Sequence, residues 1–216
     1  MTAAALAKML CLASGAFGRP AWDQARCDER AEVILAAAAR HSVDPVVMTA
    51  IDVIECDLDD RDAPVYEVRR GRRRLVGWDA CPMGMRIRGP ERRGQLGAAD
   101  LVELAASDLG RSYALCRAEH RSRSRAEPAG SAGSAGSATR ASRERLGPGS
   151  PSRSECEWRA VARRNLRSRD YAAQVLAVAG ALRGKRLEGG SLRSRPLTER
   201  TAEIVRRLLR IFRRNT

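Results

Sequence analysis

The sequence predicts a mainly α-helical domain that carries one small β-hairpin. Hydrophobic residues make up 44% of the 216-residue chain but aromatic residues only 4%, so the core must be built from small aliphatic side chains. Alanine is frequent among them, and it is the strongest helix former. Apolar residues recur at helical spacing along several segments, whereas two short runs have the composition of strands.

Two consecutive helices are expected near the start of the chain. Residues 28–41 carry Asp28 as a suitable N-cap and form one amphipathic helix. Asp44 then caps a second helix whose first residue is Pro45, where the missing N–H does no harm. This second helix runs to about Glu55 and is nearly all apolar, so we expect it to be the buried central helix.

The chain between this helix and the next is expected to be irregular apart from a hairpin. Residues 57–64 are acidic, but their spacing lacks the glycine and terminal glutamate of a calcium-binding loop. Strand-like runs at 65–68 and 75–78 flank an arginine-rich turn at 69–73. Residues 79–98 are rich in glycine and proline, which predicts a loop.

The second half of the chain alternates helices with low-complexity sequence. Residues 117–155 hold Arg-Ser and Ala-Gly-Ser repeats that cannot bury a core, so we predict a disordered insert there. Gly189 and Gly190 mark a further linker. Helices are expected over about 100–116, 157–164 and 169–183 and, after Pro196, along a basic amphipathic tail.

Charge, the N-terminus and the cysteines leave several alternatives open. The net charge of +14 invites a nucleic-acid-binding hypothesis, but interleaved aromatic residues and zinc motifs are missing from the sequence. Residues 1–18 fit a weak secretory signal or a flexible first helix equally well, and no apolar run approaches the ~20 residues that span a bilayer. Cys116 and Cys156 bracket the insert, where they form either a disulfide or buried free thiols.

Glu55 is the candidate catalytic residue. A carboxylate at the end of a hydrophobic helix is held rigidly, and apolar surroundings would raise its pKa so that it stays protonated as a general acid. The alternative is an ordinary helix-end carboxylate on the surface. Asp52 lies one turn earlier and is a competing carboxylate, which we expect to pair with an arginine, for instance one on the helix over 100–116.

The run 36–45, followed by 50–55, resembles the start of lytic transglycosylase domains, a lysozyme-like helical family. In that family a hydrophobic-Glu-Ser motif ends the second helix and carries the sole catalytic carboxylate, which Glu55 matches. The run Gly84-Met85-Arg86-Ile87 is the nearest match to a later Gly-Leu-Met-Gln motif. Asn165 and Tyr171 are similar in context to a final Tyr-Asn-x-Gly motif and the helix after it.

The resemblance implies an architecture and a reaction. A lysozyme-like domain formed by 19–116 and 156–184 would be interrupted by the insert and followed at 185–216 by a linker and the basic helix. Glu55 would protonate the bond between N-acetylmuramic acid and N-acetylglucosamine, then deprotonate the muramoyl C6 hydroxyl, leaving a 1,6-anhydro end. No metal or cofactor is implied, and the residues expected to contact substrate are Trp78, Met83, Met85, Asn165 and Tyr171.

The expected partner is therefore peptidoglycan, in the periplasm or outside the cell, with the tail helix either docked on the domain or bound to an anionic surface. A second hypothesis is a degenerate relative that binds peptidoglycan without cutting it, because Cys56, Arg86 and Arg164 depart from the family motifs. Nucleic-acid binding through the basic insert and tail is a third hypothesis, less favoured than the other two.

Overall fold

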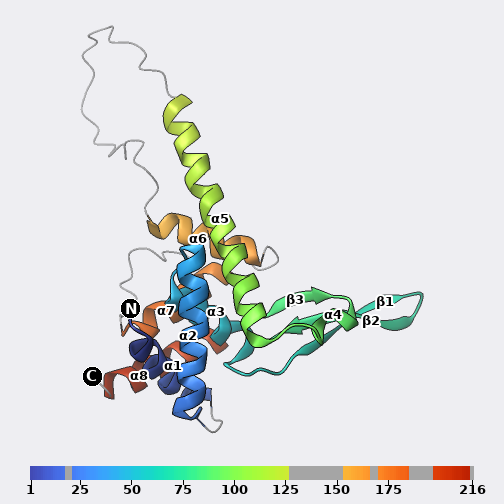
Figure 1. Ribbon diagram of the computed structural model, residues 1–216, viewed down its shortest axis with the longest axis horizontal. Helices are drawn as coiled ribbons and strands as arrows, with labels where there is room; N and C mark the ends of the chain where they lie inside the picture. The colour runs from blue at the N-terminus through green and yellow to red at the C-terminus, as the bar shows by residue number, and fades with distance from the viewer. Residues whose placement is uncertain (18–20, 127–152, 166–169, 185–196, 215–216) are drawn as a thin grey trace.

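The computed structural model describes residues 1–17, 21–126, 153–165, 170–184 and 197–214, and they form a mainly helical protein with one three-stranded antiparallel sheet (Figure 1). This confirms the predicted fold class at the level of secondary structure. The helices are α1 Ala3–Ser14, α2 Gln24–His41, α3 Pro45–Cys56, α4 Pro90–Arg93, α5 Ala98–Ala126, α6 Arg153–Arg164, α7 Tyr171–Leu182 and α8 Glu199–Arg214, with a 3-10 turn η1 at Gly15–Phe17. The strands are β1 Ala63–Arg69, β2 Arg72–Ala80 and β3 Met85–Arg88.

Helix α3 is the buried central helix that the sequence predicts. The Asp44 side chain caps it by accepting a hydrogen bond from the Val46 N–H at 2.8 Å, and Pro45 occupies the first turn. Most of its side chains are buried against α7 and α2. Asp57 ends the helix in the left-handed conformation, with φ of 51°. The last turn of α3 therefore has a fixed position and direction.

Helices α1 and α2 pack together in the core. Residues Ala3–Ser14, within the N-terminal segment whose nature the sequence left open, form a helix with Leu6 and Leu10 fully buried. A disulfide joins Cys11 of α1 to Cys27 of α2. The predicted start of α2 at Asp28 is wrong, because the cap is Asp23, which accepts a hydrogen bond from the Arg26 N–H at 2.8 Å.

The tail helix α8 is docked on the domain. Its apolar residues Ile204, Val205 and Leu208 are buried, and α8 packs against α7 and α1. Among its arginines, Arg206, Arg207 and Arg210 are exposed. Of the two alternatives for the tail, the structure shows the docked helix. In the part of the chain that the structure describes, no helix is long and apolar enough to cross a membrane.

The β-sheet is larger than the predicted hairpin. Strands β1 and β2 extend beyond the expected runs, and β3 and α4 form within residues 79–98, where a loop was expected. This prediction failed because Met85–Arg88 form a short edge strand stabilised by pairing with β2, a long-range contact that composition does not reveal. The β1–β2 hairpin projects from the helical body (Figure 1).

The edges of the predicted insert are helical, which corrects its boundaries. Helix α5 continues to Ala126 and α6 begins at Arg153, so the low-complexity composition did not prevent helix formation at either edge. Residues 127–152, and the linker glycines Gly189 and Gly190, lie outside the described residues. The Cys116–Cys156 disulfide, one of the alternatives from the sequence, joins α5 to α6.

Candidate active site

An open cleft of about 1170 Å³ lies at the end of α3, between the sheet and helices α5 and α6. Its acidic residues and its arginines are equal in number, so the cleft has no strong net charge of either sign. Of the residues predicted from the sequence, Glu55, Met85 and Asn165 line this cleft together. They come from three separate segments, α3, β3 and the end of α6.

The Glu55 side chain is exposed in the cleft. The sequence predicted apolar surroundings, and this is wrong because the apolar faces of α3 turn toward α2 and α7, while Glu55 lies on the side that faces the cleft. Glu55 makes no ion pair with any of the described residues. It is therefore a rigidly mounted carboxylate that remains available to a ligand.

Gly84 packs directly against the stem of Glu55. Its φ of +58° is in the left-handed region, and a Cβ built on it would fall 2.6 Å from Glu55 Cβ and 2.8 Å from Cγ. The Cys56–Cys81 disulfide ties the end of α3 to the turn that contains Gly84. Cys56, the position at which the sequence departs from the family serine, thus holds two of the predicted motif segments together, which the sequence did not reveal.

We expect Gly84→Ala to displace Glu55 and to lower any activity that depends on it by at least about tenfold. The added methyl group meets Cβ of Glu55, which is fixed to the helix and cannot rotate away. The positive φ also costs about 1–2 kcal/mol of stability for a residue with a Cβ. Thermal unfolding and activity of the purified variant measure the two effects separately.

Gly71→Ala provides the matched control. Gly71 has φ of +76°, and a Cβ placed there meets nothing within 4 Å. Both variants carry a similar backbone penalty, so the control should lose stability while keeping full activity. Equal activity in the two variants would show that contact between Gly84 and Glu55 has no functional role.

Two buried donors lie beneath Glu55. The Tyr171 hydroxyl is buried at the start of α7 and makes no hydrogen bond of normal geometry with the described residues. Burial, and then the negative charge of Glu55 nearby, raise the pKa of Tyr171, so this phenol remains protonated at any physiological pH. Nη2 of Arg164 contacts the Met83 carbonyl oxygen, whereas its Nη1 is buried and has no partner among the described residues.

Other residues predicted to contact substrate are placed differently. Met83 is fully buried in the core rather than lining the cleft. Trp78 is half-buried on β2, paired with Ile87 of β3, and is not among the residues that line the cleft. Arg86, one of the residues that depart from the resembled motif, pairs with Asp79 across the β2–β3 ladder.

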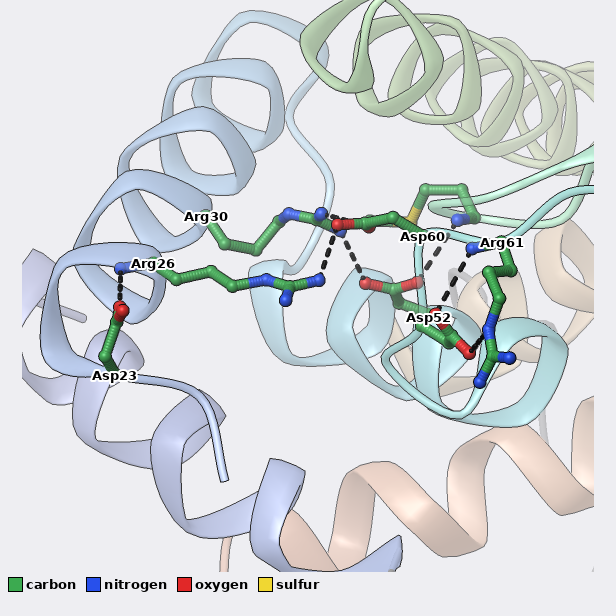
Figure 2. Close-up of polar contacts among 8 residues, drawn as sticks. Asp23, Arg26, Arg30, Asp52, Asp60 and Arg61 are labelled. Carbon is green, nitrogen blue, oxygen red and sulfur yellow. Dashed lines mark hydrogen bonds and ion pairs between the residues drawn. The ribbon is translucent and has the colours of Figure 1, made fainter. Parts of the chain in front are cut away.

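A buried ion pair supports the cleft from below. Arg30 Nη1 lies 3.0 Å from Asp52 Oδ2, and both side chains are almost fully buried (Figure 2). The other Asp52 oxygen accepts a hydrogen bond from the Met83 N–H at 3.3 Å, which positions the turn next to Gly84. Asp52 therefore pairs with an arginine as predicted, but the arginine belongs to α2 and not to the helix over 100–116.

Burial raises the pKa of Asp52 to about 6, although Arg30 and the Met83 N–H act in the opposite direction. Arg30 also pairs with Asp60 at 2.5 Å, and Asp60 pairs with Arg26 at 2.7 Å (Figure 2). The carboxylates of the acidic run after α3 are thus paired with arginines. Its further ion pairs are Asp57 with Arg200, Asp59 with Arg61 and Asp62 with Arg93.

Asp108 is a cleft residue that the sequence analysis missed. It lies on the polar side of α5 and has no ion pair within the described residues. Its sequence context is that of any solvated helix position, so nothing in the pattern singled it out.

Comparison of this chain with protein-family models, with curated proteins and with solved structures finds no match.

Proposed function

We propose that this protein cleaves peptidoglycan glycan strands as a lytic transglycosylase, with Glu55 as its single general acid and base. The observation that carries the proposal is the position of Glu55, which ends a buried helix and lies exposed in an open cleft, with no ion pair to any residue that the structure describes. The contact with Gly84 restricts its side chain from the other side. Such a fixed carboxylate fulfils the geometric requirement of acid–base catalysis.

The charge balance of the cleft favours a polar polymer of low charge density over a nucleic acid. A groove that binds a polyanion carries an excess of basic residues, whereas here acidic residues and arginines are equal in number. Many of these groups are already paired with one another, as in Asp59 with Arg61 and Asp79 with Arg86. Paired charges of this kind offer hydrogen bonds to sugar hydroxyl and amide groups.

In the proposed mechanism, protonated Glu55 donates its proton to the glycosidic oxygen as the bond to the muramoyl C1 breaks. The muramoyl C6 hydroxyl then attacks C1, and the Glu55 carboxylate takes up the proton of that hydroxyl. A 1,6-anhydro ring forms without water. The Tyr171 hydroxyl keeps its proton between these steps, because burial and the nearby charge of Glu55 raise its pKa.

The test is mass spectrometry of purified peptidoglycan after incubation with the full-length protein in water enriched in ¹⁸O. A transglycosylase releases muropeptides one water lighter than the hydrolysis products, and these carry no label. Labelled, hydrated products would instead indicate a hydrolase. Intact glycan in the presence of folded protein would overturn the proposal.

A second candidate is a protein that binds peptidoglycan without cutting it. The exposure of Glu55 favours this alternative, because a general acid that is open to water lacks the apolar enclosure that keeps a carboxyl group protonated. The same incubation distinguishes the two, since this candidate cosediments with insoluble peptidoglycan and releases no product.

A further inference from the structure

The hairpin formed by β1 and β2 carries a dense group of arginines that the proposed reaction does not use. Five arginines lie within the six residues 69–74, and all are exposed. Few of these positive charges are neutralised by acidic side chains. Arg69 lies 3.3 Å from Glu67, and Arg70, Arg72 and Arg74 have no ion pair with the described residues. The tip of the hairpin is therefore a concentrated positive charge.

The geometry of the turn presents this charge outward. Arg70 and Gly71 have φ of 50° and 76°, the pair of left-handed residues that forms a tight two-residue hairpin turn. A Cβ on Gly71 would meet nothing within 4 Å, so the turn itself is open to solvent. Because the hairpin projects from the helical body (Figure 1), its tip can approach a flat surface without obstruction by the helices.

Two apolar side chains share one face of the hairpin with Arg73, whereas Arg72 and Arg74 lie on the opposite face. Tyr66 and Val68 are two residues apart on β1, so they share a face, and the register places Arg73 opposite Val68 on that face. The Tyr66 side chain is 45% exposed and the Val68 side chain 65%. The Arg73 guanidinium lies 4.4 Å from the centre of the Tyr66 ring, so the cation and the aromatic ring form one mixed surface.

We infer that this hairpin tip, Tyr66 to Arg74, is an arm that binds the surface of an anionic phospholipid bilayer. Arginines are attracted to lipid phosphates, and tyrosine is favoured at the level of the headgroups, where its ring is in an apolar region and its hydroxyl in a polar one. Val68 adds an apolar side chain that gains by entering the interface. A soluble polyanion would use the arginines but would give no role to the exposed valine.

Two further observations favour a membrane over a nucleic acid. The described cysteines are all paired in disulfides, which is typical of an oxidising compartment where membrane surfaces are accessible and nucleic acids are scarce. The cleft beside the hairpin has balanced charge, so the basic surface does not continue as the long track that a nucleic-acid strand would need. The exposed arginines of α8 are a competing basic surface, but Arg206 and Arg207 are partly neutralised by Glu203.

The test is cosedimentation of the full-length protein with vesicles of phosphatidylcholine, alone or with about one-third phosphatidylglycerol, at about 0.1 M salt. We expect binding to the anionic vesicles alone. The variant Arg70→Gln with Arg73→Gln, one residue in the turn and one on the face of Val68, should lower the partition coefficient roughly 30-fold, because each basic residue near such a surface contributes about fivefold. The control is Arg206→Gln with Arg210→Gln on α8, which removes the same charge and should change partitioning by less than about threefold.

A third variant separates the membrane from a soluble polyanion. Val68→Ser keeps every charge and should weaken binding to anionic vesicles while leaving binding to soluble polyphosphate unchanged. The inference would be overturned if Val68→Ser weakened binding to vesicles and to polyphosphate equally. It would also be overturned if the α8 variant lost more vesicle binding than the hairpin variant, or if the wild type failed to bind anionic vesicles. None of these results depends on glycan cleavage, so the arm and the proposed enzyme can fail independently.

Discussion

Glu55→Gln is expected to lower the rate of anhydro-muropeptide release by about 10²- to 10⁴-fold. Glutamine has nearly the same shape but can neither donate the proton to the leaving oxygen nor accept it from the C6 hydroxyl, and this is the range that acid–base catalysis contributes. Stability should change little, because Glu55 is exposed and makes no ion pair in the described part of the chain. Product release, followed by chromatography over time, measures the rate.

Glu29→Gln is the matched control, since Glu29 is an exposed carboxylate on α2 that does not line the cleft. It should retain the full rate. A second variant, Asp108→Asn, tests whether the cleft uses one carboxylate or two. If Glu55→Gln remains active and Asp108→Asn is inactive, the assignment of the catalytic residue to α3 is wrong.

The sequence predicted local structure where a single residue or a short pattern determines it. Asp44 and Pro45 define the start of α3, and the almost continuous apolar run after them predicts its burial, so this helix was anticipated nearly residue by residue. The start of α2 was not, because Asp23 and Asp28 are both acceptable caps and sequence alone does not choose between them.

The candidate site was predicted less well because long-range contacts build it. Met83 and Met85 lie on either side of Gly84 in the sequence, yet one is in the core and the other lines the cleft. Their separation depends on the Cys56–Cys81 disulfide and on pairing of β3 with β2. With six cysteines and no informative spacing, the pairing cannot be derived from the sequence.

Removal of the Asp52 carboxylate is expected to give a large loss of stability. Asp52→Ala leaves the Arg30 guanidinium, whose side chain is 7% exposed, without its buried partner and removes the acceptor for the Met83 N–H. Loss of one member of a buried pair costs about 3–5 kcal/mol. Asp60→Ala is the comparison, because Asp60 contacts the same arginine but is 41% exposed, and it should cost less than half as much in denaturant unfolding.

The same carboxylate should make stability depend on pH. The folded pKa of Asp52, about 6, lies above the ordinary value of 3.8, so between these values the folded protein holds a proton that the unfolded chain has released. Stability contributed by this proton therefore increases as pH falls from 7 to 5, by about 1 kcal/mol. The wild type should gain this amount relative to Asp52→Asn, which does not titrate. If the stability of the wild type relative to Asp52→Asn instead stays constant or falls on acidification, the attraction of Arg30 for the Asp52 carboxylate outweighs burial. The ion pair beneath the cleft then remains fully charged.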